Sequence, residues 1–174
     1  IDTDAHHGDG TQWSFYTDNQ IMTYSIHETG KFLFPGSGHY TERGEDLGYG
    51  YTVNVPLEPY TEDDSYLDVF KETVEPVIAA FKPDIILSVH GVDIHYRDPL
   101  THISCTLSTL YTIPYIIQDL AARYCHHKVI MFGGGGYNIW RVVPRAWSHV
   151  FLSLIGEPIQ QGYIPLSWIN KWKL

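Results

Sequence analysis

Short apolar runs of strand length alternate along this chain with longer segments of helical periodicity. The apolar runs cover residues 1–5, 21–27, 51–55, 85–90 and 129–132, and helices are expected over about 62–81, 109–124 and 140–154. Such alternation is typical of a parallel sheet covered by helices. The long glycine-rich segment 30–50 shows no clear periodicity, and loops of that length usually carry function or are disordered. The sequence therefore predicts an α/β fold with a mainly parallel sheet.

The composition narrows the class of protein. A length of 174 residues corresponds to one domain, and 44% hydrophobic with 18% charged residues is typical of a globular chain. A net charge of −9 argues against nucleic-acid binding, and no apolar run approaches the ~18 residues of a membrane span. Two cysteines without CxxC spacing favour a reducing compartment, so we expect a cytoplasmic protein.

The amino terminus begins with Ile1 in an apolar, strand-like segment, without Met and without a signal-peptide pattern. From this start we expect residues to be missing upstream. A parallel sheet cut at Ile1 would expose an apolar edge, which could pair with the missing segment or with another chain.

The densest polar cluster lies in this first segment, which reads Asp-Thr-Asp-Ala-His-His-Gly-Asp-Gly from residue 2. In a strand, Asp2, Asp4 and His6 would share one face, because alternate side chains point to the same side. Two carboxylates and an imidazole are donors that Zn²⁺ and Fe²⁺ accept, so we favour a metal site over a solvated acidic strand.

A second polar segment follows the apolar run that ends at His90. In open α/β sheets, ligands collect at the carboxyl ends of strands, where this segment would lie beside the first cluster. Asp93, His95 and Asp98 are all candidates for a third metal ligand. An Asx-type turn is the alternative role for Asp93, and spacing alone does not choose among the three.

A run of four glycines at 133–136 precedes Tyr137, between a predicted strand and a predicted helix. Glycines allow a backbone to approach a ligand closely, and the Tyr137 phenol could donate to a developing oxyanion. A dinucleotide-binding loop is the rival interpretation. It is disfavoured because the Gly-x-Gly-x-x-Gly pattern is not met.

Taken in order, these motifs resemble those of the histone deacetylase superfamily, and most of all the bacterial acetoin utilization deacetylases. The resemblance covers nearly the whole chain and also includes Phe34-Pro35-Gly36-x-Gly38 and the segment Val-Asn-Val-Pro-Leu at 53–57. It implies the three-layer arginase-deacetylase fold, incomplete at the amino terminus. Residues 1–174 would form the carboxy-terminal part of a single catalytic domain.

The resemblance also implies roles for individual residues. Zn²⁺, with Fe²⁺ as the alternative, would be held by Asp4, His6 and Asp93, and Tyr137 would be the transition-state donor. A tunnel for the acetyl-lysine side chain would involve Phe34, Gly135 and Gly136. A structural K⁺ site would use Asp2 and Ser25, and Asp9 would lie behind the metal ligands. Asp2 and Asp9 are expected to hydrogen-bond and orient histidines.

No histidine pair in this sequence matches the general base of the family. In the family it comes from a tandem His-His pair upstream of the Asp-x-Asp-x-His strand, so the resemblance places it in the missing segment. The pairs at 6–7 and 126–127 do not match it, and His90, His95 and His102 are interpreted as ordinary loop histidines.

Three functions follow from this reading. The first is metal-dependent hydrolysis of acetyl-lysine in a protein. The second is a truncated, non-catalytic metal-binding fragment. The third is deacetylation of a small acetylated amine such as an acetylpolyamine, which would favour an acidic rim. Glu42, Glu45 and Asp46 could form such a rim, although an exposed charged loop is the simpler reading.

Overall fold

The computed structural model describes residues 1–158, 163 and 165–172. Its strands are β1 (Thr23–Glu28), β2 (Thr52–Leu57), β3 (Ile86–His90) and β4 (Val129–Gly133). β1 pairs with β2 and β3 pairs with β4, both in parallel. The predicted runs at 21–27, 51–55, 85–90 and 129–132 are therefore strands, displaced by two residues or fewer at each end.

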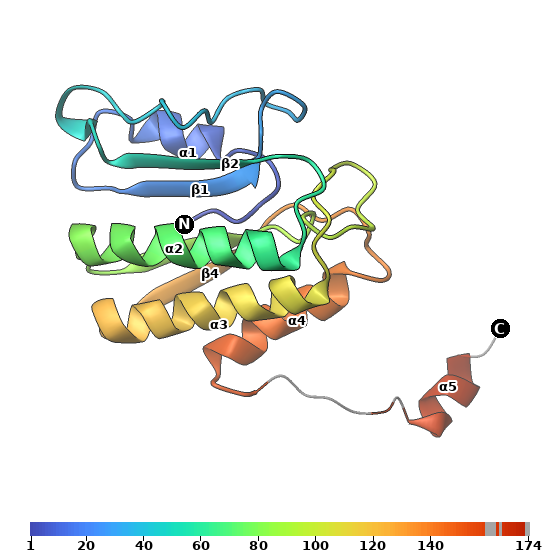
Figure 1. Ribbon diagram of the computed structural model, residues 1–174. Coiled ribbons are helices and arrows are strands. Elements are labelled where there is room, and N and C mark those ends of the chain that lie inside the picture. Colours follow the sequence, from blue (N-terminus) through green and yellow to red (C-terminus); the bar gives the residue numbers. More distant parts are fainter. Residues whose placement is uncertain (159–162, 164, 173–174) are drawn as a thin grey trace.

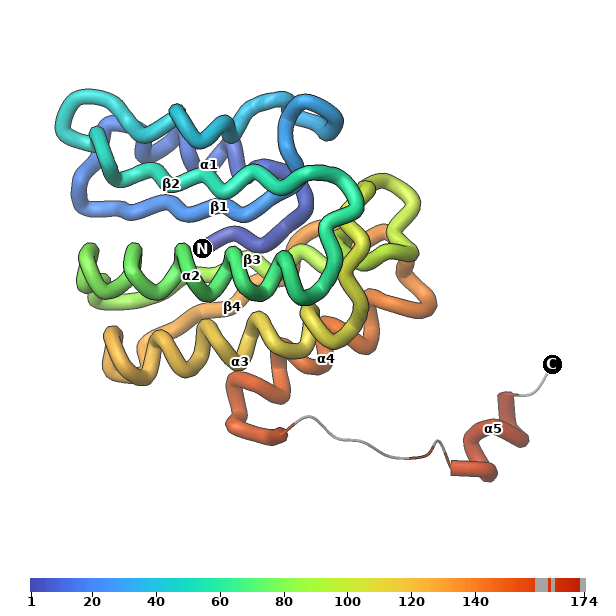
Figure 2. Tube along the Cα trace, in the orientation of Figure 1, coloured from blue at the N-terminus to red at the C-terminus, as the bar shows by residue number. Residues whose placement is uncertain are grey.

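The first residues of the chain join these two pairs into one parallel sheet. The backbone N–H of Asp2 donates to the Tyr24 carbonyl at 2.8 Å, and the N–H of Val89 donates to the Ile1 carbonyl at 2.9 Å. The tube trace shows the amino terminus between β1 and β3 (Figure 2). The order across the sheet is thus β2, β1, the first residues, β3 and β4.

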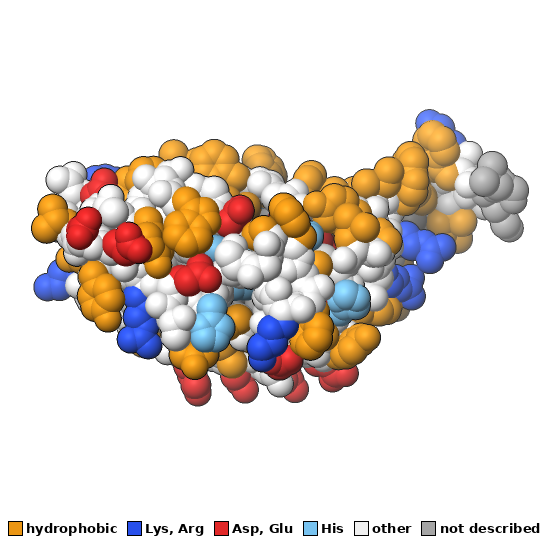
Figure 3. Space-filling model, turned by 90° about the horizontal axis from the view of Figure 1, so that it is seen from above, with side chains coloured by type: hydrophobic (Ala, Val, Ile, Leu, Met, Phe, Trp, Pro, Cys, Tyr) orange, Lys and Arg blue, Asp and Glu red, His pale blue; other side chains and the backbone are white. Residues whose placement is uncertain are grey.

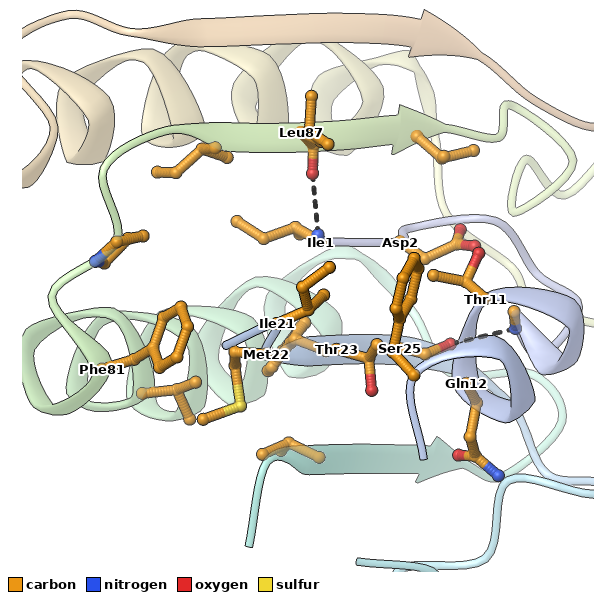
Figure 4. Close-up of a pocket in the computed structure, with 18 of the residues that line it drawn as sticks. Ile1, Asp2, Thr11, Gln12, Ile21, Met22, Thr23, Ser25, Phe81 and Leu87 are labelled. Carbon is orange, nitrogen blue, oxygen red and sulfur yellow. Dashed lines mark hydrogen bonds between the residues drawn. The ribbon is translucent and has the colours of Figure 1, made fainter. Parts of the chain in front are cut away.

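This position corrects the expectation of an apolar edge at Ile1. The Ile1 ammonium donates to the Leu87 carbonyl at 2.9 Å, inside the sheet, and the outer strands are β2 and β4 (Figure 4). The expected strand over 1–5 is also reduced to isolated bridges from Asp2 to Ser25 and Val89.

One face of the sheet is covered by helices α2 (Asp63–Phe81), α3 (Leu107–Tyr124) and α4 (Val143–Leu154) (Figure 1). The inner side of α2 carries Tyr66, Phe70, Val74 and Ile78, whose helical spacing puts all four in the core. The Thr106 side chain caps α3 by accepting from the Ser108 N–H. α4 begins three residues later than predicted.

The opposite face is covered only in part. Helix α1 (Asp9–Ser14) and the 29–51 loop, with the short 3₁₀ helix η1 (Asp46–Gly48), lie over β1 and β2. There the Gln12 side chain accepts from the Asn54 amide at 2.7 Å. The same face of β3 and β4 leaves Leu87 52%, Ile130 46% and Phe132 48% exposed. We call this surface the bare β3–β4 face.

A largely apolar cavity of about 460 Å³ lies beside the bare β3–β4 face. Ile1, Ile21, Met22, Phe81 and Leu87 line it, together with Asp2 and Gln12 at its polar end (Figure 4). On the face seen from above, basic side chains are scattered among acidic and apolar ones (Figure 3).

Two further observations complete the fold. No helix in the described part of the chain is long and apolar enough to cross a membrane. A last short helix, α5 (Leu166–Trp172), stands apart from the body (Figure 1).

Candidate metal centre and active site

Polar loops gather at the carboxyl ends of the parallel strands. They follow the first segment, β1, β3 and β4, and cover residues 4–8, 29–51, 91–106 and 134–142. In a parallel sheet all these ends lie on one edge, so segments far apart in the sequence meet there. This confirms the expectation that the cluster after residue 3 and the segment after His90 are neighbours.

Asp4, His6 and Asp93 converge at this edge. One donor atom from each lies within 4.8 Å of the others. The His6 Nδ1 is 2.9 Å from Asp4 Oδ1 and 3.0 Å from Asp93 Oδ2. Asp93 is fully buried, and its Oδ1 accepts the Ala5 N–H at 2.9 Å. The geometry thus selects Asp93 from the three candidates that spacing left open.

The electrostatics of this cluster suit a cation. Hydrogen bonds to the carboxylates of Asp4 and Asp93 raise the pKa of His6 to about 10, and burial raises the pKa of Asp93 to about 7. Burial acts in the same direction on Asp4, but its hydrogen bonds from His6 and Gly135 lower that pKa overall. Two carboxylates and one imidazole around a common point fit a divalent ion such as Zn²⁺ or Fe²⁺.

Glycines make this convergence possible. The Gly135 N–H donates to Asp4 Oδ2, and a Cβ at Gly135 would lie 2.7 Å from that oxygen and overlap Asp93 Oδ2. Gly91 is equally tight against Asp4. The sequence predicts close approach to a ligand, and the structure shows that these glycines approach the carboxylates of Asp4 and Asp93. Gly136 lies against Val92, and a role of Gly135 and Gly136 in substrate binding stays a prediction.

Tyr137 lies beside the cluster. Its ring meets the His6 ring edge-on, with centroids 6.3 Å apart, and the side chain is 45% exposed. Its backbone N–H donates to Asp98 Oδ2 at 2.9 Å. Phe34 is 76% exposed on the loop that follows β1. A tunnel wall at Phe34 stays a prediction.

Asp2 does not join Asp4 and His6, because the regular strand geometry ends before residue 4. Its Oδ1 accepts the Asp4 N–H at 3.0 Å. The Gly8 N–H donates to Ser25 Oγ at 3.4 Å, and a Cβ at Gly8 would lie 2.5 Å from Asp2 Oδ2. The Asp2 carboxylate and the Ser25 hydroxyl are therefore neighbours, as the predicted K⁺ site requires.

The expectation that Asp2 and Asp9 orient histidines is not met among the described residues. Asp2 bonds to the Asp4 backbone, and Asp9 Oδ1 accepts only the N–H of the adjacent Gly10. The His6 ring is oriented instead by the two aspartates that share its site, Asp4 and Asp93. Asp9 lies in the first turn of α1, so its chain direction carries it away from the cluster.

The other candidate histidines are engaged elsewhere. His90 is the last residue of β3 and not part of a loop; its Nε2 bonds to the Ser88 hydroxyl at 2.7 Å, and burial lowers its pKa to about 4. His95 is buried and stacks on Tyr96. The backbone N–H of His102 donates to Oε2 of the buried Glu28 at 2.8 Å, and its Nδ1 bonds to Oε1.

The acidic-rim expectation is wrong for Glu42. Its carboxylate turns inward, where it accepts the Gly38 N–H at 3.1 Å and the Gln12 side-chain N–H at 2.6 Å. Gln12 in turn bonds to His7 Nε2 at 3.0 Å. No sequence pattern predicts this network, because Gln12 lies in α1 whereas Glu42 lies in a loop 30 residues further along the chain. Glu45 and Asp46 are exposed.

Comparisons with known proteins agree with this geometry. The family model described as Histone deacetylase domain matches residues 1–154. The Acetoin utilization protein AcuC of Staphylococcus aureus (strain MRSA252) is 80% identical over 173 residues, which are 99% of this chain and 44% of that protein. The chain thus spans less than half the length of this relative.

Solved structures are similar as well. The crystal structure of an HDAC homolog from Aquifex aeolicus matches 92% of this chain and 42% of its own, with a TM-score of 0.84 and 30% identity. An acetylpolyamine aminohydrolase from Burkholderia pseudomallei matches 88% and 43%, with a TM-score of 0.78 and 27% identity. The chain belongs to the histone deacetylase family and has its arginase-deacetylase fold.

Proposed function

We propose that this chain carries the metal-ligand part of a metal-dependent lysine deacetylase of the acetoin utilization type. The observation that supports this most strongly is the convergence of Asp4, His6 and Asp93 beside Tyr137. The substrate would be an acetylated lysine of a protein. The two buried free cysteines agree with a cytoplasmic location, which is part of the proposal.

The residues divide the work as follows. Asp4, His6 and Asp93 would hold Zn²⁺ or Fe²⁺. The ion would supply Lewis-acid polarisation of the acetyl carbonyl and increase the acidity of water. The Tyr137 phenol would donate a hydrogen bond to the oxyanion, and Phe34 with the backbone of Gly135 and Gly136 would line the acyl-lysine side chain.

Asp2 and Ser25 would hold the structural K⁺. Neutral and anionic oxygens are the donors that a hard monovalent cation accepts, and these two groups both lie against Gly8. By fixing the segment that leads into Asp4, the site would keep the metal ligands in place.

The general base would be a His-His pair in the part of the domain that this chain does not span. Two observations support this. His6 lies in the cluster with Asp4 and Asp93 that would hold the metal, and His90, His95 and His102 are each held by other contacts. The bare β3–β4 face offers an apolar surface on which the remaining part of the domain could pack.

Acetylpolyamine deacetylation is the second candidate, because the chain resembles an acetylpolyamine aminohydrolase in structure. The inward position of Glu42 removes one of the three acids that could form a cation-binding rim. Glu45 and Asp46 stay available, so the substrate test below includes a diamine.

The experiment measures acetate release from an acetyl-lysine peptide and from an acetylated diamine, with Zn²⁺ and, anaerobically, with Fe²⁺. It compares this chain alone with the chain joined to the segment that precedes the matched region in the Staphylococcus aureus relative. We expect metal uptake by both proteins and turnover of the peptide by the joined protein. Tyr137→Phe should lower turnover roughly 100-fold or more.

The other possible results of this experiment favour the alternative interpretations. Turnover by the chain alone would place the base within these residues. A preference for the diamine would favour the second candidate. Metal uptake by the joined protein without acetate from either substrate would contradict the proposed activity and favour a non-catalytic metal-binding role.

A further inference from the structure

Tyr137 needs an external contact to hold its position. Four consecutive glycines precede it, and glycine restricts the backbone less than any other residue. Its side chain is 45% exposed, so packing against the core does not fix it either. A tyrosine that must donate to one developing oxyanion requires a defined place.

The glycine run is held at Gly135 by hydrogen bonds to residues of the site. The Gly135 N–H donates to Asp4 Oδ2, and the Val92 N–H donates to the Gly135 carbonyl at 2.7 Å. Gly136 follows with a φ of 156°, a backbone conformation that residues other than glycine rarely adopt. Tyr137 therefore depends on contacts made after Gly136.

Those contacts come from the loop that follows Asp93. Asp98 Oδ2 accepts the Tyr137 N–H at 2.9 Å, and the Asn138 amide donates to the Arg97 carbonyl at 3.0 Å. The other oxygen, Asp98 Oδ1, accepts the Leu100 N–H at 3.0 Å. Both carboxylate oxygens are thus engaged, one within its own loop and one on the tyrosine.

The loop that carries Asp98 is itself tied to the metal ligand. The Thr101 hydroxyl donates to the Asp93 carbonyl, and the Asp98 N–H donates to the His95 carbonyl at 2.7 Å. The next residue, His102, is held by the buried Glu28 at the end of β1. These hydrogen bonds, together with the short loop that carries them, therefore connect Asp93 through Asp98 to Tyr137.

We propose that Asp98 is the positioning residue that fixes Tyr137 relative to the metal ligands. A carboxylate suits this role because it offers two acceptor oxygens, and hydrogen bonds to an ionised acceptor are stronger than neutral ones. The consequence for turnover rests on the proposed function, whereas the fixing of the Tyr137 backbone does not.

Asp18 provides a matched control. Its Oδ1 accepts the Gln20 N–H at 2.7 Å, which is the same i to i+2 turn that Asp98 makes with Leu100. Asp18→Ala therefore removes the same type of turn bond at a position away from the site. Asp98→Asn is the conservative variant, because one acceptor oxygen remains for two N–H groups.

The first readout is amide hydrogen exchange at Tyr137 in this chain, which does not require turnover. We expect exchange at residue 137 to rise on the order of tenfold in Asp98→Ala, less in Asp98→Asn, and not at all in Asp18→Ala. Zinc affinity should stay within about twofold of wild type, since Asp98 is not a ligand. Unchanged exchange in both Asp98 variants would overturn the proposal. If Asp98→Ala does not fold, Asp98→Asn alone decides.

The second readout is a double-mutant cycle on the joined protein described above. Asp98→Ala should lower kcat about tenfold or more with little change in KM, and it should have no further effect in a Tyr137→Phe background. Losses that multiply in the double variant would show that Asp98 does not act through Tyr137. If the joined protein has no turnover, the proposed function fails, but the exchange result still decides the position of Tyr137.

Discussion

The edge at the strand carboxyl ends and the bare β3–β4 face differ in almost every respect. At the edge, buried polar groups such as Asp93 and Glu28 have hydrogen-bond partners, and glycines allow backbones to touch carboxylates. On the face, Leu87, Ile130 and Phe132 are half exposed on a parallel sheet, a type of sheet that proteins normally bury on both sides.

The fold must bring the candidate metal ligands together and must also bury its apolar surface, and the two regions show that these requirements are met to different degrees. Asp4, His6 and Asp93, which we propose hold the metal, already lie together within the described residues. The burial of apolar surface is not complete. We therefore expect metal binding and turnover to depend on different parts of the domain.

Among substitutions that leave Asp4, His6 and Asp93 unchanged, those at the glycine contacts of the site should have the largest effect on metal affinity. Gly135→Ala should weaken Zn²⁺ binding roughly 10- to 100-fold, because the added Cβ would displace the carboxylates of Asp93 and Asp4. Titration calorimetry measures this. Gly10→Ala is the control, because a Cβ there meets nothing within 4 Å and Ala favours the helix. Equal Zn²⁺ affinities of the two variants would mean that the Asp4 and Asp93 carboxylates can make room for the added Cβ without losing the metal.

The next prediction concerns the pH dependence of stability and rests on the buried His27. Its Nδ1 bonds to Ser25 Oγ at 2.8 Å, its Nε2 bonds to the Gly38 carbonyl at 2.9 Å, and burial lowers its pKa to about 4. Between pH 6.5 and 4 the unfolded chain takes up this proton and the folded chain does not. His27 therefore lowers the free energy of unfolding by about 1.4 kcal/mol per pH unit as the pH falls through that window.

The measurement is urea unfolding of the metal-free chain at several pH values. Burial raises the pKa of Asp2 to about 6 and that of Asp93 to about 7, which gives slopes of the opposite sign. The test is consequently the difference between His27→Gln and wild type, which should remove the slope due to His27. The exposed His126→Gln is the control. A difference that is independent of pH would contradict the neutral, buried state of His27.

Substitutions on the bare β3–β4 face should have the smallest effect on metal affinity. Ile130→Lys should reduce self-association of this chain, because it places a charge on an exposed apolar strand at the sheet edge, and Zn²⁺ affinity should not change. Sedimentation velocity measures the association, with Leu47→Lys on η1 as the control. Equal association of Ile130→Lys and wild type would show that this face does not mediate self-association.

Much of the fold could be predicted because it depends on local patterns. The apolar runs specify the strands, and the spacing of Tyr66, Phe70 and Val74 specifies α2. The order of strands could not be predicted from these patterns. It depends on which strands pair across the sheet, and this placed Ile1 inside the sheet instead of at an edge.

The site shows the same division. Asp4 and His6 are two residues apart, so their proximity was evident, and the motif resemblance named Asp93 before the geometry did. The roles of Asp98 and Glu42 depend on contacts between loops, with Asp98 and Tyr137 39 residues apart in the sequence. The sequence left Asp98 as one of three candidate metal ligands and favoured an exposed charged loop for Glu42. Only the positions of the loops show the contacts that each carboxylate makes.

The most direct measurement is a calorimetric titration of this chain alone with Zn²⁺. The account predicts one bound ion per chain, with affinity roughly 100-fold weaker or worse in Asp93→Ala and unchanged in Asp18→Ala. Wild-type affinity in Asp93→Ala, or no binding by the wild-type chain, would contradict the claim that these residues form a complete metal centre.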